Sequence, residues 1–297
     1  MKCPLFSFNN PAEAEFCIEC GKKIEFCCPD CGAATPAKGK FCMKCGHPLK
    51  DSQKLPTIDY SKPHSYTPKH LADKILTNRS SLEGERKIVT VLFADVANYT
   101  AMSEKLDPDE VLQIMDGAFK IMMDETHKYE GTINQFTGDG IMAIFGAPVA
   151  HENHAQRACY TALSIQTAMT DYSARIEKRY GIDFKIRIGI NSGAVIVSAI
   201  GDDLRMDYTA VGDTTNLSAR IQQASKQGQV WVSLETRNII QDYFHLEPVG
   251  EISLKGKAQP QTIYRVVSER TGVRTRFDAG LVRGITDLVG RDRKSVV

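Results

Sequence analysis

The sequence has no apolar run that approaches the ~20 residues of a membrane-spanning helix. Its N-terminus also lacks the basic and then apolar layout of a secretory signal. Charge of one sign does not dominate, because 37 Lys and Arg side chains stand against 36 Asp and Glu, and no broad field would recruit nucleic acid or an anionic membrane. These absences predict a cytoplasmic protein with no membrane partner and no nucleic-acid partner.

Cysteine is nearly absent from most of the chain but dense at its start, since all of the nine cysteines except Cys159 fall between Cys3 and Cys45. Without a secretion signal, this density indicates metal binding and not a disulfide framework. The first half of residues 1–50 aligns with the second half as an internal repeat. The second copy carries two C-x-x-C knuckles, which predict one tetrahedral zinc site with four ligands: Cys28, Cys31, Cys42 and Cys45.

The first copy of the repeat lacks one ligand, because Phe6 stands where a cysteine is expected. Three cysteines remain as candidate zinc ligands in this copy: Cys3, Cys17 and Cys20. Cys27 is the nearest spare thiol, and a different zinc set stays open: Cys17 and Cys20 with Cys28 and Cys31. Residues 1–50 are therefore expected to form a double zinc ribbon in which structural Zn²⁺ supplies most of the folding free energy.

Residues 51–84 read as a linker followed by a lead-in helix. The stretch Asp51–Pro68 is polar and contains three prolines, which is typical of an extended tether. From Lys69 to about Arg79, apolar residues recur at helical spacing and predict a short helix.

Residues 85–268 alternate between strand and helix patterns in the order β-α-β-β-α-β. This order predicts an α+β, ferredoxin-like sandwich, in which helices pack on one face of an antiparallel sheet. The expected strands are Ile88–Ala94, Thr132–Phe136, Ile141–Phe145 and Phe184–Ile190, and the expected helices begin at Asp107 and Asn153. Ala194–Ile200 follows Ser192-Gly193 and is expected to return as a second hairpin.

Two aspartates stand beside strongly apolar runs in this region. Asp95 follows the first expected strand, and Asp139 lies in Thr137–Gly140, whose glycines favour a tight hairpin turn. Carboxylates at the ends of adjacent strands can hold divalent cations that activate a phosphate. The alternative is that both are turn residues that bind nothing.

A third expected helix, from about Asp213 to Lys226, carries Asn216 and Arg220 four residues apart and so on one helix face. An amide and a guanidinium in this arrangement can orient a ribose or phosphate oxygen and offset its developing charge. The alternative is an ordinary polar helix surface.

Taken in order, four blocks resemble the class III adenylate/guanylate cyclase domain over about Glu85 to Val267. These blocks are Phe93–Val96, Phe136–Gly140, Tyr208–Arg220 and Leu254–Lys257. The resemblance implies that Asp95 and Asp139 hold two Mg²⁺ or Mn²⁺ ions, with the Val96 carbonyl assisting. It further implies that a homodimer shares its sites, and that the enzyme makes cyclic AMP and pyrophosphate from ATP in signalling.

The resemblance also assigns the substrate contacts. Asn216 would orient the ribose, Arg220 would stabilise the α-phosphate, and Lys255 would contact the triphosphate. The backbone from Ala97 to Thr100 would cradle the phosphates, so that Asn98, Tyr99 and Thr100 contribute with Ala97. Gln135 and Thr209 occupy the positions that select the base.

Base selection is where the chain departs from the family pattern. Adenylate cyclases usually have lysine at the position of Gln135 and often aspartate at the position of Thr209. Amide and hydroxyl groups both donate and accept, so this pair discriminates adenine from guanine less sharply, and GTP stays open as a substrate. A catalytically weak, nucleotide-binding regulatory module is the alternative function.

The ribbons and linker resemble an architecture in which an AAA-type ATPase module follows the cyclase. We therefore expect residues 269–297 to lead toward such a module, although no G-x-x-x-x-G-K-[ST] motif follows. The last six residues match what a common sequencing adapter would encode, so we expect a truncated terminus there.

Overall fold

The computed structural model describes residues 26–27, 33–35, 42–45, 60, 63–78, 85–200, 206–209, 214–254, 259–273 and 278. The chain divides into two compact units, Met1–Ile58 and Asp59–Val297, and we describe each by itself. In the first unit, β1 (Phe26–Cys27) pairs antiparallel with β2 (Ala34–Thr35), and a turn follows at residues 43–45.

The second unit begins with η1 (Pro63–Ser65) and α1 (Lys69–Asn78), and α1 confirms the predicted lead-in helix. The elements that follow are β3 (Arg86–Val96), α2 (Tyr99–Ser103), α3 (Pro108–Lys128), β4 (Thr132–Phe136), β5 (Gly140–Phe145), α4 (His154–Tyr180), β6 (Ile186–Ile200), β7 (Met206–Thr209), α5 (Thr214–Ala224), β8 (Val230–Ser233), α6 (Leu234–Ile240), β9 (Phe244–Ile252) and β10 (Gln261–Glu269). Helix α3 starts as predicted, with Pro108 in its first turn and the Glu110 carboxylate accepting from the Asp107 N–H at 3.4 Å.

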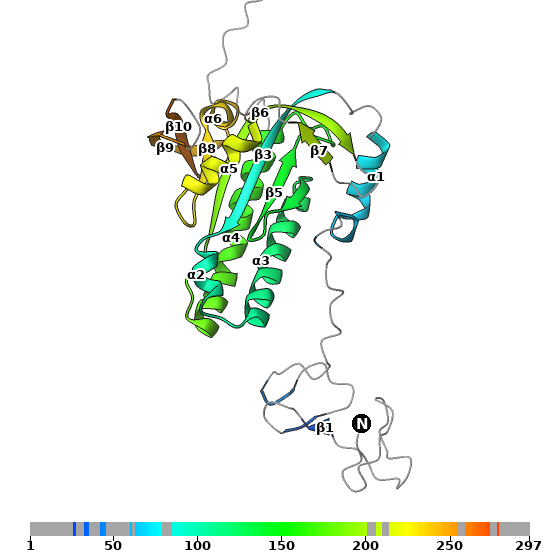
Figure 1. Cartoon of the computed structure of the whole chain (residues 1–297), viewed down its shortest axis with the longest axis vertical. Coiled ribbons are helices and arrows are strands. Elements are labelled where there is room, and N and C mark those ends of the chain that lie inside the picture. The colour runs from blue at the N-terminus through cyan, green and yellow to red at the C-terminus, as the bar shows by residue number, and fades with distance from the viewer. Residues whose placement is uncertain are drawn as a thin grey trace, which may run out of the picture. The chain divides into compact units, whose positions relative to one another are not determined.

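The strands form one sheet in the order β4-β5-β3-β6-β8-β10-β9, with β7 paired to β6. The first four strands in this order pair antiparallel with one another and reproduce the predicted ferredoxin-like arrangement. The sheet as a whole is mixed, since β6 and β8 pair in parallel. Figure 1 shows α3 and α4 running side by side along this sheet.

The predicted second hairpin at Ser192-Gly193 is wrong. Strand β6 runs unbroken from Ile186 to Ile200 and pairs with β3 in continuous register from Val96↔Ile186 to Arg86↔Ile196. Gly193 is not a turn residue: a Cβ there would lie 2.6 Å from the Thr214 Oγ1 of α5. Its missing side chain therefore makes room for a helix that packs on the strand.

Helices cover both faces of the sheet, whereas one covered face was predicted. Directly paired residues of antiparallel strands point to the same face, so Phe93 shares a face with Gly189 and Met142. A Cβ on Gly189 would lie 2.2 Å from the Gln222 backbone nitrogen, which places α5 on this face. Helix α1 joins the same side, since Leu71 and Ile75 pack in one cluster with strand residues Val89, Val91, Met142, Ile144 and Val195.

The opposite face packs against α4. There the Thr90 hydroxyl meets the His154 Nδ1 of α4 at 2.7 Å and the Ser192 hydroxyl of β6 at 2.7 Å. The sheet is thus covered on both sides, and Thr90 and Ser192 are hydrogen-bonded within the α4 layer. Asp95 lies on the α5 face, so the candidate metal ligands belong to this side of the sheet.

The two β6 glycines give a graded test of the α5 contact. Gly189→Ala forces Cβ against backbone, so we expect a loss of about 3 kcal/mol or more in the free energy of unfolding. Gly193→Ala meets only a side chain that can rotate, so we expect about 1 kcal/mol. Urea unfolding of both variants measures the difference, and equal losses would contradict the close approach of α5 at Gly189.

Candidate active site

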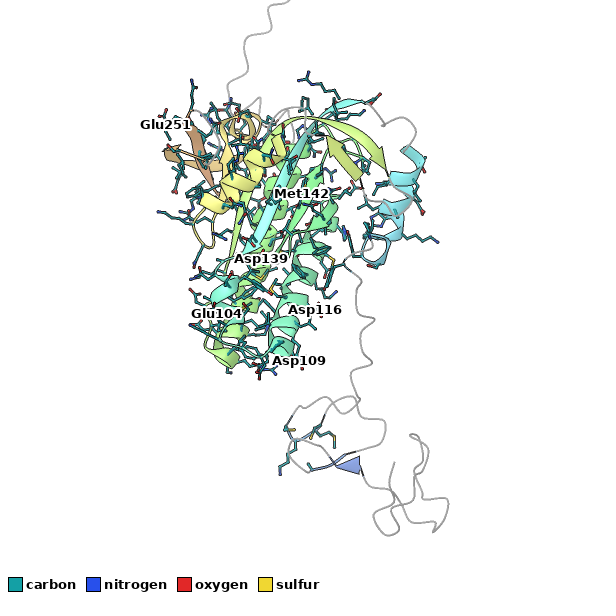
Figure 2. All side chains as sticks on the ribbon, in the orientation of Figure 1. Glu104, Asp109, Asp116, Asp139, Met142 and Glu251 are labelled. Carbon is teal, nitrogen blue, oxygen red and sulfur yellow. The ribbon has the colours of Figure 1, made fainter. Side chains whose placement is uncertain are left out.

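The two predicted aspartates come together at one end of the sheet. Asp95 in β3 pairs directly with Gly140, the first residue of β5, and Asp139 precedes that glycine in the hairpin turn. The Val96 N–H donates to the Asp139 carbonyl at 3.0 Å, which ties the turn to the end of β3. Figure 2 shows Asp139 at this end of the hairpin, with Met142 farther along β5.

Gly140 permits this close approach. A Cβ at this position would lie 2.1 Å from the Ala94 carbonyl oxygen and 2.9 Å from the Asp95 Cα. Only glycine fits there without moving β3 away from the hairpin. Gly138, at φ 90°, supplies the left-handed residue that the predicted turn requires.

The two oxygens of Asp95 have different surroundings. Oδ2 accepts from Arg187 Nη2 at 2.9 Å and from Gln222 Nε2 at 2.9 Å. Oδ1 is buried and has no hydrogen-bond partner among the residues that the structure describes. Burial and the neighbouring Asp139 carboxylate raise the pKa of Asp95 to about 6, against the opposing effects of Arg187 and Gln222.

These features fit a divalent cation. An ionised carboxylate oxygen can only accept, so neither Asp139 nor Asp95 satisfies the other when both are charged. A hard cation such as Mg²⁺ or Mn²⁺ binds carboxylate oxygens and would supply the positive charge that the buried Oδ1 lacks. Both predicted ligands therefore suit such an ion.

The predicted phosphate cradle lies where β3 runs into α2. Asn98 is left-handed (φ 58°, ψ 31°) and is the N-cap of α2, which contains Tyr99 and Thr100. The first N–H groups of a helix have no intrahelical acceptor and so can bind an anion. The Ala97 N–H is not available for this, because it donates to the Lys185 carbonyl at 2.8 Å.

A β-bulge turns Gln135 toward the face of Asp95. The β4–β5 register shifts between Ile133 and Gln135, so Gln135 pairs with Met142. Met142 belongs to the α5 face, whereas its neighbours along β5 face the other side. Gln135 is exposed on the face that carries Asp95, as a residue that reads a bound base must be.

Asn216 and Arg220 lie on α5, as predicted, but they turn away from Asp95. Gln222 is the residue of α5 that reaches Asp95. At 100° per residue, Asn216 lies about 120° and Arg220 about 160° around the helix from Gln222. One chain therefore does not bring these two side chains to the aspartates.

Several predicted site residues fall outside the described residues: Lys255, Cys3, Cys17, Cys20, Cys28 and Cys31. For Thr209 only the backbone is described, as the last residue of β7. Cys42 is buried and Cys45 is exposed. The Lys44 N–H approaches Cys42 Sγ at 3.4 Å, and such a donor stabilises a thiolate, the form that binds zinc.

Arg187 and Gln222 are site residues that sequence reasoning missed. A signal was present for Arg187, since it is a basic residue on one face of the otherwise apolar Ile186–Ile190 alternation. Gln222 stands four residues after Ser218, on the stripe of α5 that faces the sheet. Its role depends on how closely α5 approaches β6, which no local pattern reveals.

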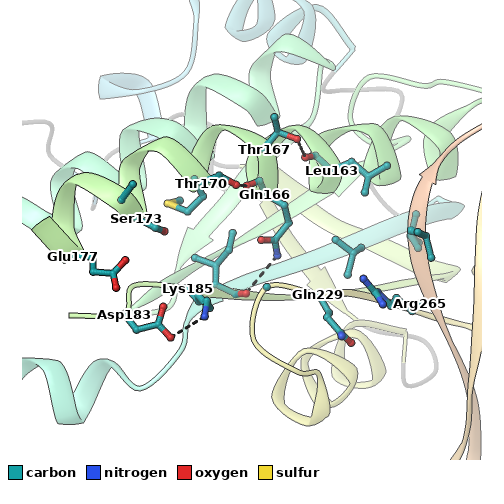
Figure 3. Close-up of a pocket in the computed structure, with 17 residues that line it drawn as sticks. Leu163, Gln166, Thr167, Thr170, Ser173, Glu177, Asp183, Lys185, Gln229 and Arg265 are labelled. Atoms are coloured by element: carbon teal, nitrogen blue, oxygen red, sulfur yellow. Dashed lines mark hydrogen bonds and ion pairs between the residues drawn. The ribbon is translucent and has the colours of Figure 1, made fainter. Parts of the chain in front are cut away.

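A hollow of about 810 Å³ lies away from the aspartates, between α4 and the starts of β6 and β8. On its wall Lys185 donates to Asp183 at 2.8 Å, and Gln166 donates to the Ile186 carbonyl at 3.4 Å. Figure 3 marks the pair of Asp183 and Lys185 with a dashed line. Its lining includes none of the predicted site residues.

No helix in the described ranges combines the length and apolar character that crossing a bilayer requires.

Each of the two units contains a segment that matches a known protein family. Residues 83–268 match the family described as the adenylate and guanylate cyclase catalytic domain, and residues 3–46 match the double zinc ribbon family. The sequence is similar to adenylate cyclase 1 of Rhizobium meliloti (strain 1021), with 31% identity over 215 residues, or 71% of this chain and 32% of the relative. The chain thus spans about a third of that relative's length.

Solved structures of both substrate classes resemble the chain. The adenylyl cyclase CyaB from P. aeruginosa is 33% identical with a TM-score of 0.60, over 65% of this chain and 100% of that one. The guanylate cyclase domain of RhGC from Catenaria anguillulae, solved in complex with GTP, is 27% identical with a TM-score of 0.54, over 63% of this chain and 100% of that one.

Metal binding by the two aspartates has a readout that does not require turnover. At saturating Mn²⁺ we expect the melting temperature of the wild-type protein to rise by about 5 °C or more, because the ion binds only the folded state. Asp95→Asn and Asp139→Asn should remove this rise. The control Asp183→Asn removes an exposed carboxylate elsewhere and should keep it. An undiminished rise in both site variants would contradict the assignment.

Proposed function

The chain belongs to the adenylate and guanylate cyclase catalytic domain family, and on that premise we propose that it converts ATP to 3′,5′-cyclic AMP and pyrophosphate at the interface of a homodimer. One observation supports a site shared between two copies of the chain. The aspartates lie on the α5 face of the sheet, while Asn216 and Arg220 point away from them on α5. A second copy related by a twofold axis can complete the site, and symmetry then gives two sites per dimer.

In this proposal Asp95 and Asp139 hold two Mg²⁺ or Mn²⁺ ions, assisted by the Val96 carbonyl. When bound, the ions neutralise the charge on the phosphates and stabilise both the attacking and the leaving oxygens. Two protein carboxylates suffice, because Mg²⁺ in nucleotide enzymes completes its shell with substrate phosphate and water. The N–H groups of Asn98, Tyr99 and Thr100 bind phosphate oxygens, and Lys255 neutralises part of the triphosphate.

The reaction joins the ribose 3′-oxygen to the α-phosphorus. That new P–O bond replaces the bond from the α-phosphorus to the bridging oxygen, so pyrophosphate leaves and the 3′-hydroxyl proton passes to solvent. Asn216 of the partner subunit orients the ribose for this in-line attack. Arg220 of the partner subunit stabilises the charge that develops on the α-phosphate oxygens.

Gln135 and Thr209 read the base in this proposal. An amide can turn to donate to adenine N1 or to accept from guanine N1–H, so it penalises the wrong base less than lysine does. We favour ATP, with the named adenylate cyclases as support, and GTP as a weaker substrate. We also propose that residues 3–46, which match the double zinc ribbon family, bind structural Zn²⁺. An ATPase module that follows the cyclase domain is a further part of this proposal.

Mixing two inactive variants tests the shared site. We expect Asp95→Asn and Arg220→Ala each to lower the rate of cyclic AMP formation at least about 100-fold. In an equal mixture, half of the dimers are mixed, and each mixed dimer has one intact site of two. We therefore expect about a quarter of the wild-type rate, measured with Mn²⁺ and separately with ATP and with GTP.

Arg237→Ala, on α6, is the matched loss of an arginine and should keep the wild-type rate when assayed alone. In an equal mixture with Asp95→Asn it should give about half of the wild-type rate, because one quarter of the dimers keep two intact sites and one half keep one. A mixture of the two inactive variants no more active than either variant would contradict a site shared between chains. Nucleotide-dependent thermal stabilisation of the wild-type protein with no cyclic product would instead support the regulatory module.

A further inference from the structure

We propose that Arg187 and Gln222 are positioning residues that hold one oxygen of Asp95 and so present its other oxygen to the divalent cation. The inference rests on the metal site of the proposed function and adds two residues to it.

The contacts are specific to one oxygen. Arg187 Nη2 and Gln222 Nε2 both donate to Oδ2, each at 2.9 Å, while Oδ1 has no hydrogen-bond partner in the described residues. The Asp95 side chain is 16% exposed and Gln222 is 5% exposed, so water competes little for these bonds. With Oδ2 held on two sides, the carboxylate has little freedom to rotate.

The backbone arrangement brings both Arg187 and Gln222 to Asp95. Asp95 pairs directly with Arg187 across β3 and β6, so their side chains leave the sheet on the same face. Gln222 reaches the carboxylate because Gly189 lets the backbone of α5 approach β6. Ser218, one turn earlier on α5, fixes the helix by donating to the Val91 and Gly189 carbonyls at 2.8 and 3.0 Å.

A held carboxylate binds a cation with a smaller loss of side-chain entropy, and partners of this kind commonly contribute 10- to 100-fold to metal affinity. Arg187 also offsets part of the repulsion between Asp95 and Asp139 before the ion arrives. The opposite role is a placeholder, in which the Arg187 guanidinium competes with the ion for Asp95. The two roles predict opposite changes in affinity when the contacts are removed.

Direct Mn²⁺ binding to the full chain, without nucleotide and followed by electron paramagnetic resonance of free Mn²⁺, separates them. Gln222→Met keeps the length of the side chain and removes the donor, so we expect a dissociation constant about 10-fold higher. Arg187→Lys keeps the charge and loses the planar fork, and we expect a similar increase. Saturating Mn²⁺ should return kcat of both variants toward the wild-type value, because the ligand itself is intact.

Gln223→Met is the matched control, since it makes the same chemical change on the exposed neighbouring residue and should leave the Mn²⁺ dissociation constant unchanged. The urea midpoint in EDTA, measured for each variant, reports any general loss of fold. A dissociation constant for Gln222→Met equal to or below that of the wild type overturns the proposal.

The outcomes also separate this inference from the proposed function. Wild-type protein that binds Mn²⁺ and makes no cyclic nucleotide, with weaker binding in Gln222→Met, refutes the cyclase proposal and supports the positioning role. An active wild-type cyclase whose Gln222→Met variant binds Mn²⁺ equally well refutes only the positioning role. Absence of saturable Mn²⁺ binding in the wild-type protein overturns both.

Discussion

The rest of the site depends on the close approach of two carboxylates at the end of a β-hairpin. The antiparallel register sets Gly140 against Asp95, and the missing Cβ allows the Asp139 turn to close over the end of β3. Bringing two negative charges together in a partly buried place raises the pKa of Asp95 and is costly without a cation. A positive charge at this place therefore stabilises the fold, and the Arg187 guanidinium supplies part of that charge through its ion pair with Asp95.

In the proposed function, the same sheet face explains why Asn216 and Arg220 would act from a second copy of the chain. Helix α5 lies on that face through glycine contacts and commits Ser218 and Gln222 to the sheet. A helix that turns two residues inward must turn Asn216 and Arg220 outward. Packing that supports the metal site thus prevents a single chain from completing it. Within this account, dimerisation follows from helix geometry.

Much of the architecture could be predicted from the sequence, because its strongest patterns are local. The capping box at Asp107 and the glycine turn at Gly138 gave correct element positions. The error at Gly193 has a physical cause, since a glycine that admits a helix looks like a glycine that makes a turn. The bulge that redirects Gln135 and the contacts of Gln222 depend on pairing between distant segments, which local pattern does not encode.

The most direct test of the central claim is an anomalous-scattering map of crystals grown with Mn²⁺ and a non-cyclisable ATP analogue. The account predicts a manganese peak within bonding distance of Asp95 Oδ1 and of the Asp139 carboxylate, with Arg187 and Gln222 still on Oδ2. It also predicts that Asn216 and Arg220 of the partner subunit contact the same nucleotide. Manganese bound away from both aspartates, or a nucleotide completed by one chain alone, would contradict it.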